Sequence, residues 1–189
     1  MKNLNMDTNI LFQRLETERL ILRQLTMDDK EFIFRQFSDP EVCRYFDEEP
    51  FSTVEEAQEL IEWYARPDKD PWRRWGIVKK DDGVMIGTCG YHKWDRRHLR
   101  VEIGYDIYKD HWSHGYMTEA LKTLIGFCFD ILKVNRIDAL THPENNRSIK
   151  LLTKYGFQKE GILREYVCHG GKFDDQLSLS LLKREWAHY

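Results

Sequence analysis

Apolar residues recur along the first part of the chain with two different spacings, and each spacing predicts a different element. In "ERLILRQL", Leu20, Leu22 and Gln24 alternate with their neighbours, which is typical of a short strand. The following "TMDDKEFIFRQFSD" predicts a helix with Thr26 as its N-cap. A second helix is expected to begin at Ser52 or Thr53 and to end around residues 67–71, where two prolines stand. Its apolar face comprises Val54, Ala57, Leu60, Ile61 and Tyr64.

The middle of the chain predicts three consecutive antiparallel strands. The stretches "RRWGIVKK" and "VMIGTCGYHKW" flank a turn at Asp82-Gly83, which suits a hairpin. The stretch "LRVEIGYDIY" continues the meander, because its apolar residues recur at every second position.

The last third predicts helices and strands in alternation. Residues from Gly115 to about Lys133 form a long amphipathic helix, "RIDALTH" a strand and "NNRSIKLLTKY" a helix that Gly156 ends as a left-handed cap. A final hairpin turns near Gly170-Gly171. Three antiparallel strands followed by alternating strands and helices predict one mixed α/β domain over residues 1–189.

Composition excludes several classes of partner. The 189 residues carry a formal net charge of −3, so no positive field predicts nucleic acid or an anionic membrane as the partner. No apolar run is long enough to span a bilayer, and the N-terminus lacks a signal-peptide core. We therefore expect a soluble, cytoplasmic protein.

Cysteine and histidine spacings give no support for a metal site. Cys43, Cys89, Cys128 and Cys168 form no CxxC pair, so small buried residues in a reducing compartment are the favoured interpretation, with a catalytic thiol as the alternative. The seven histidines show no ligand spacing such as HExxH. We expect no metal.

The stretch "HWSHGYMTEAL" places Gly115 between the end of a predicted strand and the start of a predicted helix. The first turn of such a helix offers unpaired backbone N–H groups and a positive dipole end. Because Gly115 has no Cβ, an anionic group can approach this backbone closely, although a plain connecting turn is the commoner explanation for such a glycine. Neither GxGxxG nor GxxxxGK[ST] is present, so dinucleotide and nucleoside-triphosphate sites are not expected.

Three blocks in this order resemble the GNAT N-acetyltransferase superfamily. "EIGYDIYKDHWSHGYMTEAL" is similar to its acyl-coenzyme A signature, whose core is Q/R-x-x-G-x-G/A. "HPENNRSIKLLTKYGFQKEG" resembles the N-x-x-S…G-F-x-x-E-G block, and "ETERLILRQLTMDD" the T-x-R-L-x-L-R block. Together they are typical of the branch named for ribosomal-protein alanine and serine N-acetyltransferases. The resemblance implies a GNAT fold, with a mostly antiparallel mixed sheet of about six to seven strands flanked by about four helices.

The resemblance implies a site for acetyl-coenzyme A as cosubstrate. Backbone N–H groups would hold the pyrophosphate, and a bulge in the preceding strand would supply an N–H for the acetyl oxygen. The pyrophosphate residues would be His114, Gly115, Tyr116, Met117 and Thr118, and the oxyanion donor would come from Asp106, Ile107 or Tyr108. Three residues depart from the pattern: Trp112 replaces Gln or Arg, Ser113 a common Gly, and Met117 a small residue, whose bulk is expected to narrow the approach to the pyrophosphate.

Two side chains are implied as catalytic. Glu102 stands at the position of a general base, with a solvated strand face or an ion pair with Arg100 as the alternatives. Ser148 would protonate the leaving thiolate, or hold an ordered water that does so, since Leu152 stands where many members have a tyrosine. Asn145 would contact the pantetheine arm, and Asn145 with Ser148 also suits the N-cap of a helix.

The resemblance implies a primary amine as acceptor, with the N-terminal α-amine of a protein or peptide as the first choice. A polyamine, an amino acid derivative or an aminoglycoside is the alternative substrate class, and a non-catalytic acyl-coenzyme A binding module is the alternative function. Residues implied to line the acceptor pocket are Glu165, Tyr166, His169 and the acidic stretch from Tyr45 to Phe51, with Asp47, Glu48 and Glu49. Such acids suit an ammonium acceptor, although a solvated run of charges is their commoner explanation. The assembly state stays open, with a homodimer among the options.

Overall fold

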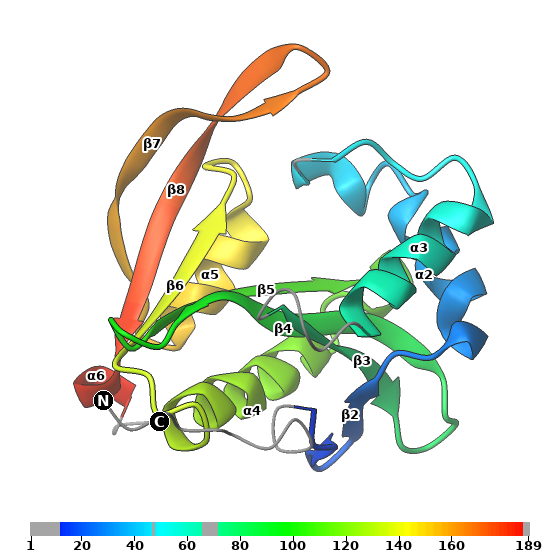
Figure 1. Ribbon diagram of the computed structural model, residues 1–189, viewed down its shortest axis with the longest axis horizontal. Helices are drawn as coiled ribbons and strands as arrows, with labels where there is room; N and C mark the ends of the chain where they lie inside the picture. Colours follow the sequence, from blue (N-terminus) through cyan, green and yellow to red (C-terminus); the bar gives the residue numbers. More distant parts are fainter. Residues whose placement is uncertain (1–11, 47, 66–71, 187–189) are drawn as a thin grey trace.

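The computed structural model describes residues 12–46, 48–65 and 72–186, and its centre is one mixed sheet (Figure 1). Eight strands pair in the order β1-β2-β3-β4-β5-β6-β8-β7, and β5–β6 is the parallel pair. The strands are β1 (Leu15–Glu16), β2 (Leu20–Gln24), β3 (Arg73–Lys79), β4 (Met85–Asp95), β5 (Arg100–Ile107), β6 (Arg136–Thr141), β7 (Gln158–His169) and β8 (Lys172–Leu182). The sheet exceeds the expected number because the two-residue β1 adds an edge to β2.

Helices cover both faces of this sheet. They are α2 (Lys30–Phe37), α3 (Val54–Ala65), α4 (Tyr116–Asp130), α5 (Asn146–Lys154) and the short α6 (Lys183–Trp186). Alternate residues of one strand face opposite helices: Ile77 packs in the cluster that contains α4, and Val78 in the cluster that contains α2 and α3. The expected hairpin turns, at Gly83 and at Gly170-Gly171, have positive φ angles in each glycine.

Side-chain caps determine where the N-terminal helices begin. Thr26 is the N-cap, as predicted, and forms a capping box with Asp29; a short 3-10 turn (Met27–Asp29) precedes α2. At α3 the Glu56 carboxylate accepts the backbone N–H groups of Ser52 and Thr53, both at 2.8 Å. The predicted end of this helix at residues 67–71 lies outside the described residues.

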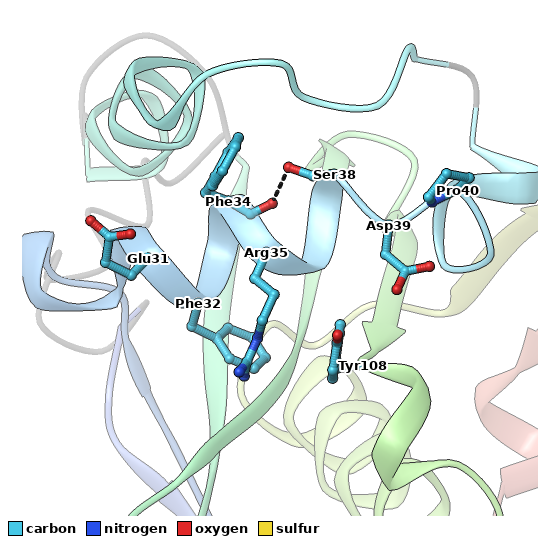
Figure 2. Close-up of a pocket in the computed structure, with 8 residues that line it drawn as sticks. All are labelled: Glu31, Phe32, Phe34, Arg35, Ser38, Asp39, Pro40 and Tyr108. Atoms are coloured by element: carbon cyan, nitrogen blue, oxygen red, sulfur yellow. Dashed lines mark hydrogen bonds between the residues drawn. The ribbon is translucent and has the colours of Figure 1, made fainter.

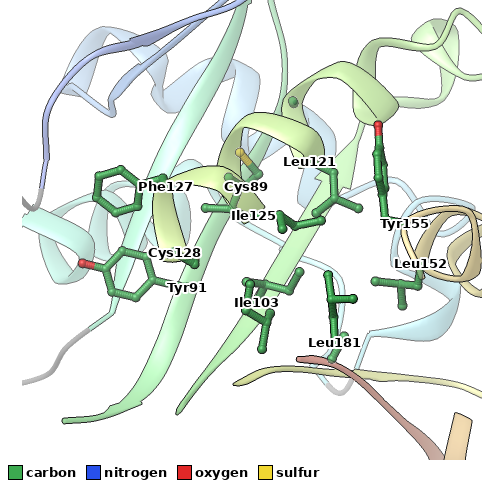
Figure 3. Packing of buried hydrophobic residues seen from close by; sticks show 14 of the residues in the cluster. Cys89, Tyr91, Ile103, Leu121, Ile125, Phe127, Cys128, Leu152, Tyr155 and Leu181 are labelled. Carbon is green, nitrogen blue, oxygen red and sulfur yellow. The ribbon is translucent and has the colours of Figure 1, made fainter. Parts of the chain in front are cut away.

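The larger core lies between the sheet and helices α4 and α5 (Figure 3). Leu121, Ile125 and Cys128 of α4 pack on Ile103 of β5, and Leu152 of α5 closes one end. Burial of each such side chain contributes about 1.5–3 kcal/mol, which fixes α4 and therefore its N-terminus relative to β5.

The structure shows the burial of the four cysteines and the character of the helices. Cys43, Cys89 and Cys128 are buried as expected, but Cys168 is exposed, because it lies on the solvated part of the long β7–β8 hairpin. Within the described ranges no helix combines the length and apolar character needed to cross a membrane.

Candidate active site

Strands β5 and β6 run side by side over only a few residues and then diverge (Figure 1). Their register covers Arg100–Glu102 against Arg136–Asp138. Beyond Glu102, β5 continues to Ile107 in register with β4 alone among the described strands. The edge of β5 that faces β6 is therefore free of a partner strand along residues 103–107, and we call this region the fork.

The β5 strand does not have the bulge that the resemblance implied near its end. Its pairing with β4 is regular from Gly87–Ile107 to His92–Glu102, and the register shifts only between His92 and Asp95. A donor for the acetyl oxygen must therefore come from regular strand geometry.

Backbone direction separates the three predicted oxyanion residues. The Tyr108 N–H donates to the Ile86 carbonyl at 2.9 Å and so points toward β4. Since N–H groups alternate along a strand, the Asp106 N–H points the same way and the Ile107 N–H points into the fork. The Ile107 carbonyl accepts the Trp112 indole N–H at 2.8 Å, on the side away from β4. Ile107 is thus the one predicted residue whose N–H faces the fork.

The N-terminus of α4 has the form expected of an anion cradle. Gly115 is its N-cap with φ of 79°, a conformation that side chains disfavour, and no side chain caps it. The first bond of the helix is Glu119 N–H to the Gly115 carbonyl. In the part of the chain that the structure describes, the N–H groups of Gly115, Tyr116, Met117 and Thr118 have no hydrogen-bond acceptor.

A cation that the sequence analysis missed lies beside this cradle. Arg19 donates to the His114 carbonyl at 3.2 Å, and its guanidinium lies 4.7 Å from the centre of the Tyr116 ring. A bidentate contact with Glu119, through its side chain and its backbone N–H at 2.7 Å each, holds it there. The T-x-R-L block could have indicated this residue, since Arg19 belongs to it, but the contact spans 100 residues.

The departures from the acyl-coenzyme A pattern have structural explanations. The Met117 side chain is 8% exposed and packs in the core. Contrary to the expectation from the sequence, it therefore does not narrow the approach to the backbone. Trp112 packs under the Arg147 guanidinium at 3.9 Å while its indole holds the end of β5. Ser113 has φ of 65°, a conformation in which the usual glycine is unstrained.

Ser148 and Asn145 lie together at the start of α5. Asn145 is the N-cap, and its Oδ1 accepts the Ser148 backbone N–H at 3.1 Å, as the capping interpretation predicted. The Ser148 hydroxyl lies 2.9 Å from the Tyr105 hydroxyl, across the fork. Burial raises the pKa of the Tyr105 phenol well above its usual value, and the hydrogen bond with Ser148 offsets this only in part. Tyr105 was missed, because its alternation in β5 indicated only a core residue.

Glu102 lies on the opposite face of β5 from Tyr105. Its carboxylate Oε1 is 2.7 Å from His92 Nε2, and Oε2 is 3.1 Å from Lys93 Nζ. The alternative expectation, an ion pair between Glu102 and Arg100, was wrong, since Arg100 lies 3.7 Å from Asp95 instead. Burial would raise the pKa of Glu102, but the His92 hydrogen bond and the Lys93 charge hold it below its usual value.

The Asp106 side chain anchors the same face of the sheet. It is 6% exposed and bonds to Arg74, Gln36 and the Thr88 hydroxyl, the last at 2.7 Å. These contacts join α2, β3, β4 and β5. Asp106 therefore contributes rigidity to the strand that carries the fork.

The residues expected around the acceptor lie at two facing loops. Glu49 comes within 3.4 Å of the position that a Cβ on Gly170 would take, so the loop before α3 reaches the β7–β8 turn. Tyr45 stacks on His142 after β6, at 5.1 Å. Glu165 and Tyr166 are exposed on β7. Asp47 and the His169 side chain lie outside what the structure describes.

A hollow of about 710 Å³ lies next to the end of β5 (Figure 2). Its walls are α2, residues 38–40 after it and Tyr108, and the Arg35 guanidinium lies 4.8 Å from the centre of the Tyr108 ring. Glu102 and Ser148 do not line it, so it adjoins the fork rather than containing the candidate catalytic side chains. Among the described residues, no group of three or more His, Cys, Asp or Glu could hold a metal ion.

Similar proteins point to one chemistry and to more than one acceptor. An uncharacterized N-acetyltransferase, p20 of Bacillus licheniformis, is 41% identical over 93% of this chain and 99% of its own length. YdaF of Bacillus subtilis (strain 168), named as a candidate ribosomal N-acetyltransferase, is 34% identical over 56% of this chain and 57% of its own. The spermidine N(1)-acetyltransferase of Escherichia coli (strain K12) is 23% identical over 87% of each.

Solved structures agree on the fold. The spermidine N-acetyltransferase of Vibrio cholerae, in complex with CoA and spermine, has a TM-score of 0.78 at 23% identity over 88% of this chain and 97% of its own. The family model described as "Acetyltransferase (GNAT) domain" matches residues 19–158, which include β5, the cradle and α5. Acetyltransferases of this family use acetyl-coenzyme A. The chain therefore belongs to the GNAT acetyltransferase family and is an N-acetyltransferase with the GNAT fold.

Proposed function

We propose that this enzyme moves an acetyl group from acetyl-coenzyme A to the N-terminal α-amine of a protein or peptide. The observation that carries the proposal is the fork. The Ile107 N–H points away from β4 at one edge of β5 and meets no acceptor among the described residues, with Glu102 on one face of the strand and Ser148 beside the other face. Acetyl-coenzyme A supplies the acetyl group as a thioester, and the chain supplies anion binding, orientation and proton transfer.

The cradle and the fork would bind different parts of acetyl-coenzyme A. N–H groups from Gly115 to Thr118 would hold the pyrophosphate, with Arg19 adding positive charge at the rim. Asn145, at the start of α5, would face the pantetheine arm. The Ile107 N–H would donate to the acetyl oxygen, where negative charge develops.

Proton transfer is assigned to the two faces of β5. A base on the Glu102 face of β5 would take the proton of the amine, and the Ser148 hydroxyl would donate a proton to the departing thiolate. Tyr105 hydrogen-bonds Ser148 and stays protonated, because its pKa is raised. Ser148 thereby keeps a fixed orientation.

The α-amine is favoured by its acidity. An α-amine has a pKa of about 7.7–8.0 and a lysine amine about 10.4, so removing the proton of lysine costs about 3 kcal/mol more. A base of modest strength serves the more acidic ammonium better. The candidate ribosomal acetyltransferase among the relatives supports this acceptor class.

A polyamine is the second candidate, because of the acidic rim. Glu48 and Glu49 precede α3, Glu49 reaches the β7–β8 turn, and a relative acts on spermidine. Such a rim would attract a multiply charged ammonium over about one Debye length, roughly 8 Å in physiological salt. Replacing Glu48 and Glu49 by Gln should then raise KM for a polyamine and leave KM for a neutral peptide's α-amine nearly unchanged.

The deciding experiment is a competition among acceptors. Peptides with a free small N-terminal residue, N-blocked peptides with an internal lysine, and spermidine are mixed at equal concentration with limiting acetyl-coenzyme A. The proposal predicts that the free α-amine takes most of the acetyl groups. Preferential acetylation of spermidine or of blocked lysine peptides would reject the α-amine as the preferred acceptor.

A further inference from the structure

His92 of β4 and Glu102 of β5 form a pair on the face of the sheet that α2 and α3 cover. The two residues are register partners, and His92 Nε2 lies 2.7 Å from Glu102 Oε1. Both side chains are largely buried, at 13% and 16% exposed. The Trp72 ring stacks on the imidazole at 4.2 Å and 17°, which fixes the ring plane. This is the arrangement of an oriented imidazole rather than of a surface ion pair.

The Glu102 carboxylate is engaged on both oxygens. Lys93 Nζ lies 3.2 Å from Oε1 and 3.1 Å from Oε2, in addition to the His92 contact. These partners stabilise the charged carboxylate, so Glu102 accepts a further proton reluctantly. An ionised carboxylate is only an acceptor, and His92 Nε2 must therefore carry the hydrogen of this bond. In the neutral ring Nδ1 then has the free lone pair.

A glycine, rather than a residue with a side chain, stands next to that lone pair. Gly104 follows Glu102 on the same face of β5, and a Cβ there would lie 4.0 Å from His92 Nδ1 and 3.3 Å from a terminal nitrogen of Arg74. The lack of a side chain at Gly104 keeps room beside Nδ1, at the stretch of β5 where the fork opens. The charged groups near the imidazole are Glu102 from β5, Lys93 from its own strand and Arg74 from β3.

We propose that His92 Nδ1 takes the proton of the acceptor amine, and that Glu102 is a positioning residue that holds the ring in the required tautomer. The inference rests on the proposed acetyl transfer and names its base. As the amine nitrogen bonds to the acetyl carbon and the carbon–sulfur bond breaks, one proton passes from nitrogen to Nδ1. The thiolate takes a proton from the Ser148 side, and His92 returns its proton to solvent. An imidazole is well matched to this transfer, because its ordinary pKa of about 6.5 lies near neutral pH.

The first test compares His92→Gln with His98→Gln. The amide introduced by His92→Gln can still donate to Glu102 but cannot act as a base, and the exposed His98 lies away from the fork on the β4–β5 turn. We expect kcat/KM for the amine to fall by about 10²–10⁴ in His92→Gln only, with unchanged affinity for acetyl-coenzyme A. Activity within about threefold of wild type in His92→Gln would overturn the inference.

Two further measurements keep the inference testable if that variant folds poorly. The wild-type pH profile of kcat/KM should show an ascending limb that is absent from the profile of His92→Gln. His92→Ala should regain activity when imidazole is added, because removal of the ring leaves a space beside Trp72, whereas His98→Ala should not respond. Profiles of the same shape in the two proteins, or no rescue in a folded His92→Ala protein, would contradict the role of His92. A wild-type enzyme that acetylates no amine would instead overturn the proposed function, and the role of His92 with it.

Discussion

Ser113 and Gly115 stand two residues apart in the loop before α4, and both have left-handed backbone conformations. Their φ angles are 65° and 79°. A side chain in this conformation costs about 1–2 kcal/mol, whereas glycine adopts it freely at an entropic cost of about 0.5–1 kcal/mol.

We therefore expect opposite effects from exchanging the two residue types. Ser113→Gly should raise the free energy of unfolding by up to about 1 kcal/mol, and Gly115→Ala should lower it by about 1–2 kcal/mol. Urea unfolding of both variants measures this. Equal destabilisation by the two substitutions would show that strain does not govern the loop.

The Tyr105–Ser148 hydrogen bond gives a second prediction at the residue scale. Ser148→Ala keeps the α5 cap, because the cap uses the Ser148 backbone N–H, but it removes the hydrogen-bond partner of a partly buried phenol hydroxyl. That loss costs about 1–3 kcal/mol, whereas removing both hydroxyls is nearly neutral. Tyr105→Phe with Ser148→Ala should thus be more stable than the sum of the single effects predicts.

The wild type, the two single variants and the double variant also separate the effect on stability from the effect on catalysis. If Ser148 protonates the thiolate, kcat falls by about 10²–10⁴ in Ser148→Ala, and the double variant falls no further. Tyr91→Phe is the matched control, since the buried Tyr91 hydroxyl has no hydrogen-bond partner among the described residues. Wild-type kcat in Ser148→Ala would remove Ser148 from the mechanism.

At the scale of elements, the capping box of the 3-10 turn before α2 depends on one carboxylate. Asp29 accepts the Thr26 backbone N–H at 2.8 Å and a bidentate contact from Arg23 at 2.7 and 2.8 Å. Burial would raise the pKa of Asp29, but Arg23 and Thr26 together hold it below its usual value. The charged form is therefore stabilised by folding.

The lowered pKa of Asp29 determines how the free energy of unfolding changes with pH. With a lowered pKa in the folded state, the contribution of Asp29 is complete above the unfolded pKa of about 3.9 and is lost as the pH falls through the folded value. Asp29→Asn should cost about 1–3 kcal/mol at pH 7, and this difference from wild type should shrink between pH 5 and pH 3. The exposed Asp28→Asn serves as control. A difference that stays constant with pH would contradict the ion pair's role.

At the scale of the whole molecule, periodicity predicted most of the elements. The hairpin turn at Asp82-Gly83, the long helix after Gly115 and the left-handed Gly156 all lie where local signals placed them. Such signals are local, because caps and turns act within a few residues.

Contacts between distant segments could not be predicted in this way. The His92–Glu102 pair depends on the register of β4 and β5, and the Tyr105–Ser148 bond joins residues 43 apart. Likewise, spacing alone does not say whether the N–H of Ile107 or of Tyr108 faces the fork, because that depends on which strand pairs with β5. Local signals therefore predicted the elements that form the fork and the cradle, but not the side-chain contacts between them.

The central claim is that the α4 N-terminus and the free edge of β5 hold acetyl-coenzyme A, and amide NMR tests it most directly. Uniformly ¹⁵N-labelled protein is titrated with acetyl-coenzyme A, and each backbone N–H that gains an acceptor changes its proton shift. We predict the largest changes at residues 115–118 and at Ile107, with a smaller change at Tyr108, whose N–H already donates to Ile86. Saturable binding that leaves residues 115–118 and Ile107 unperturbed would contradict the account.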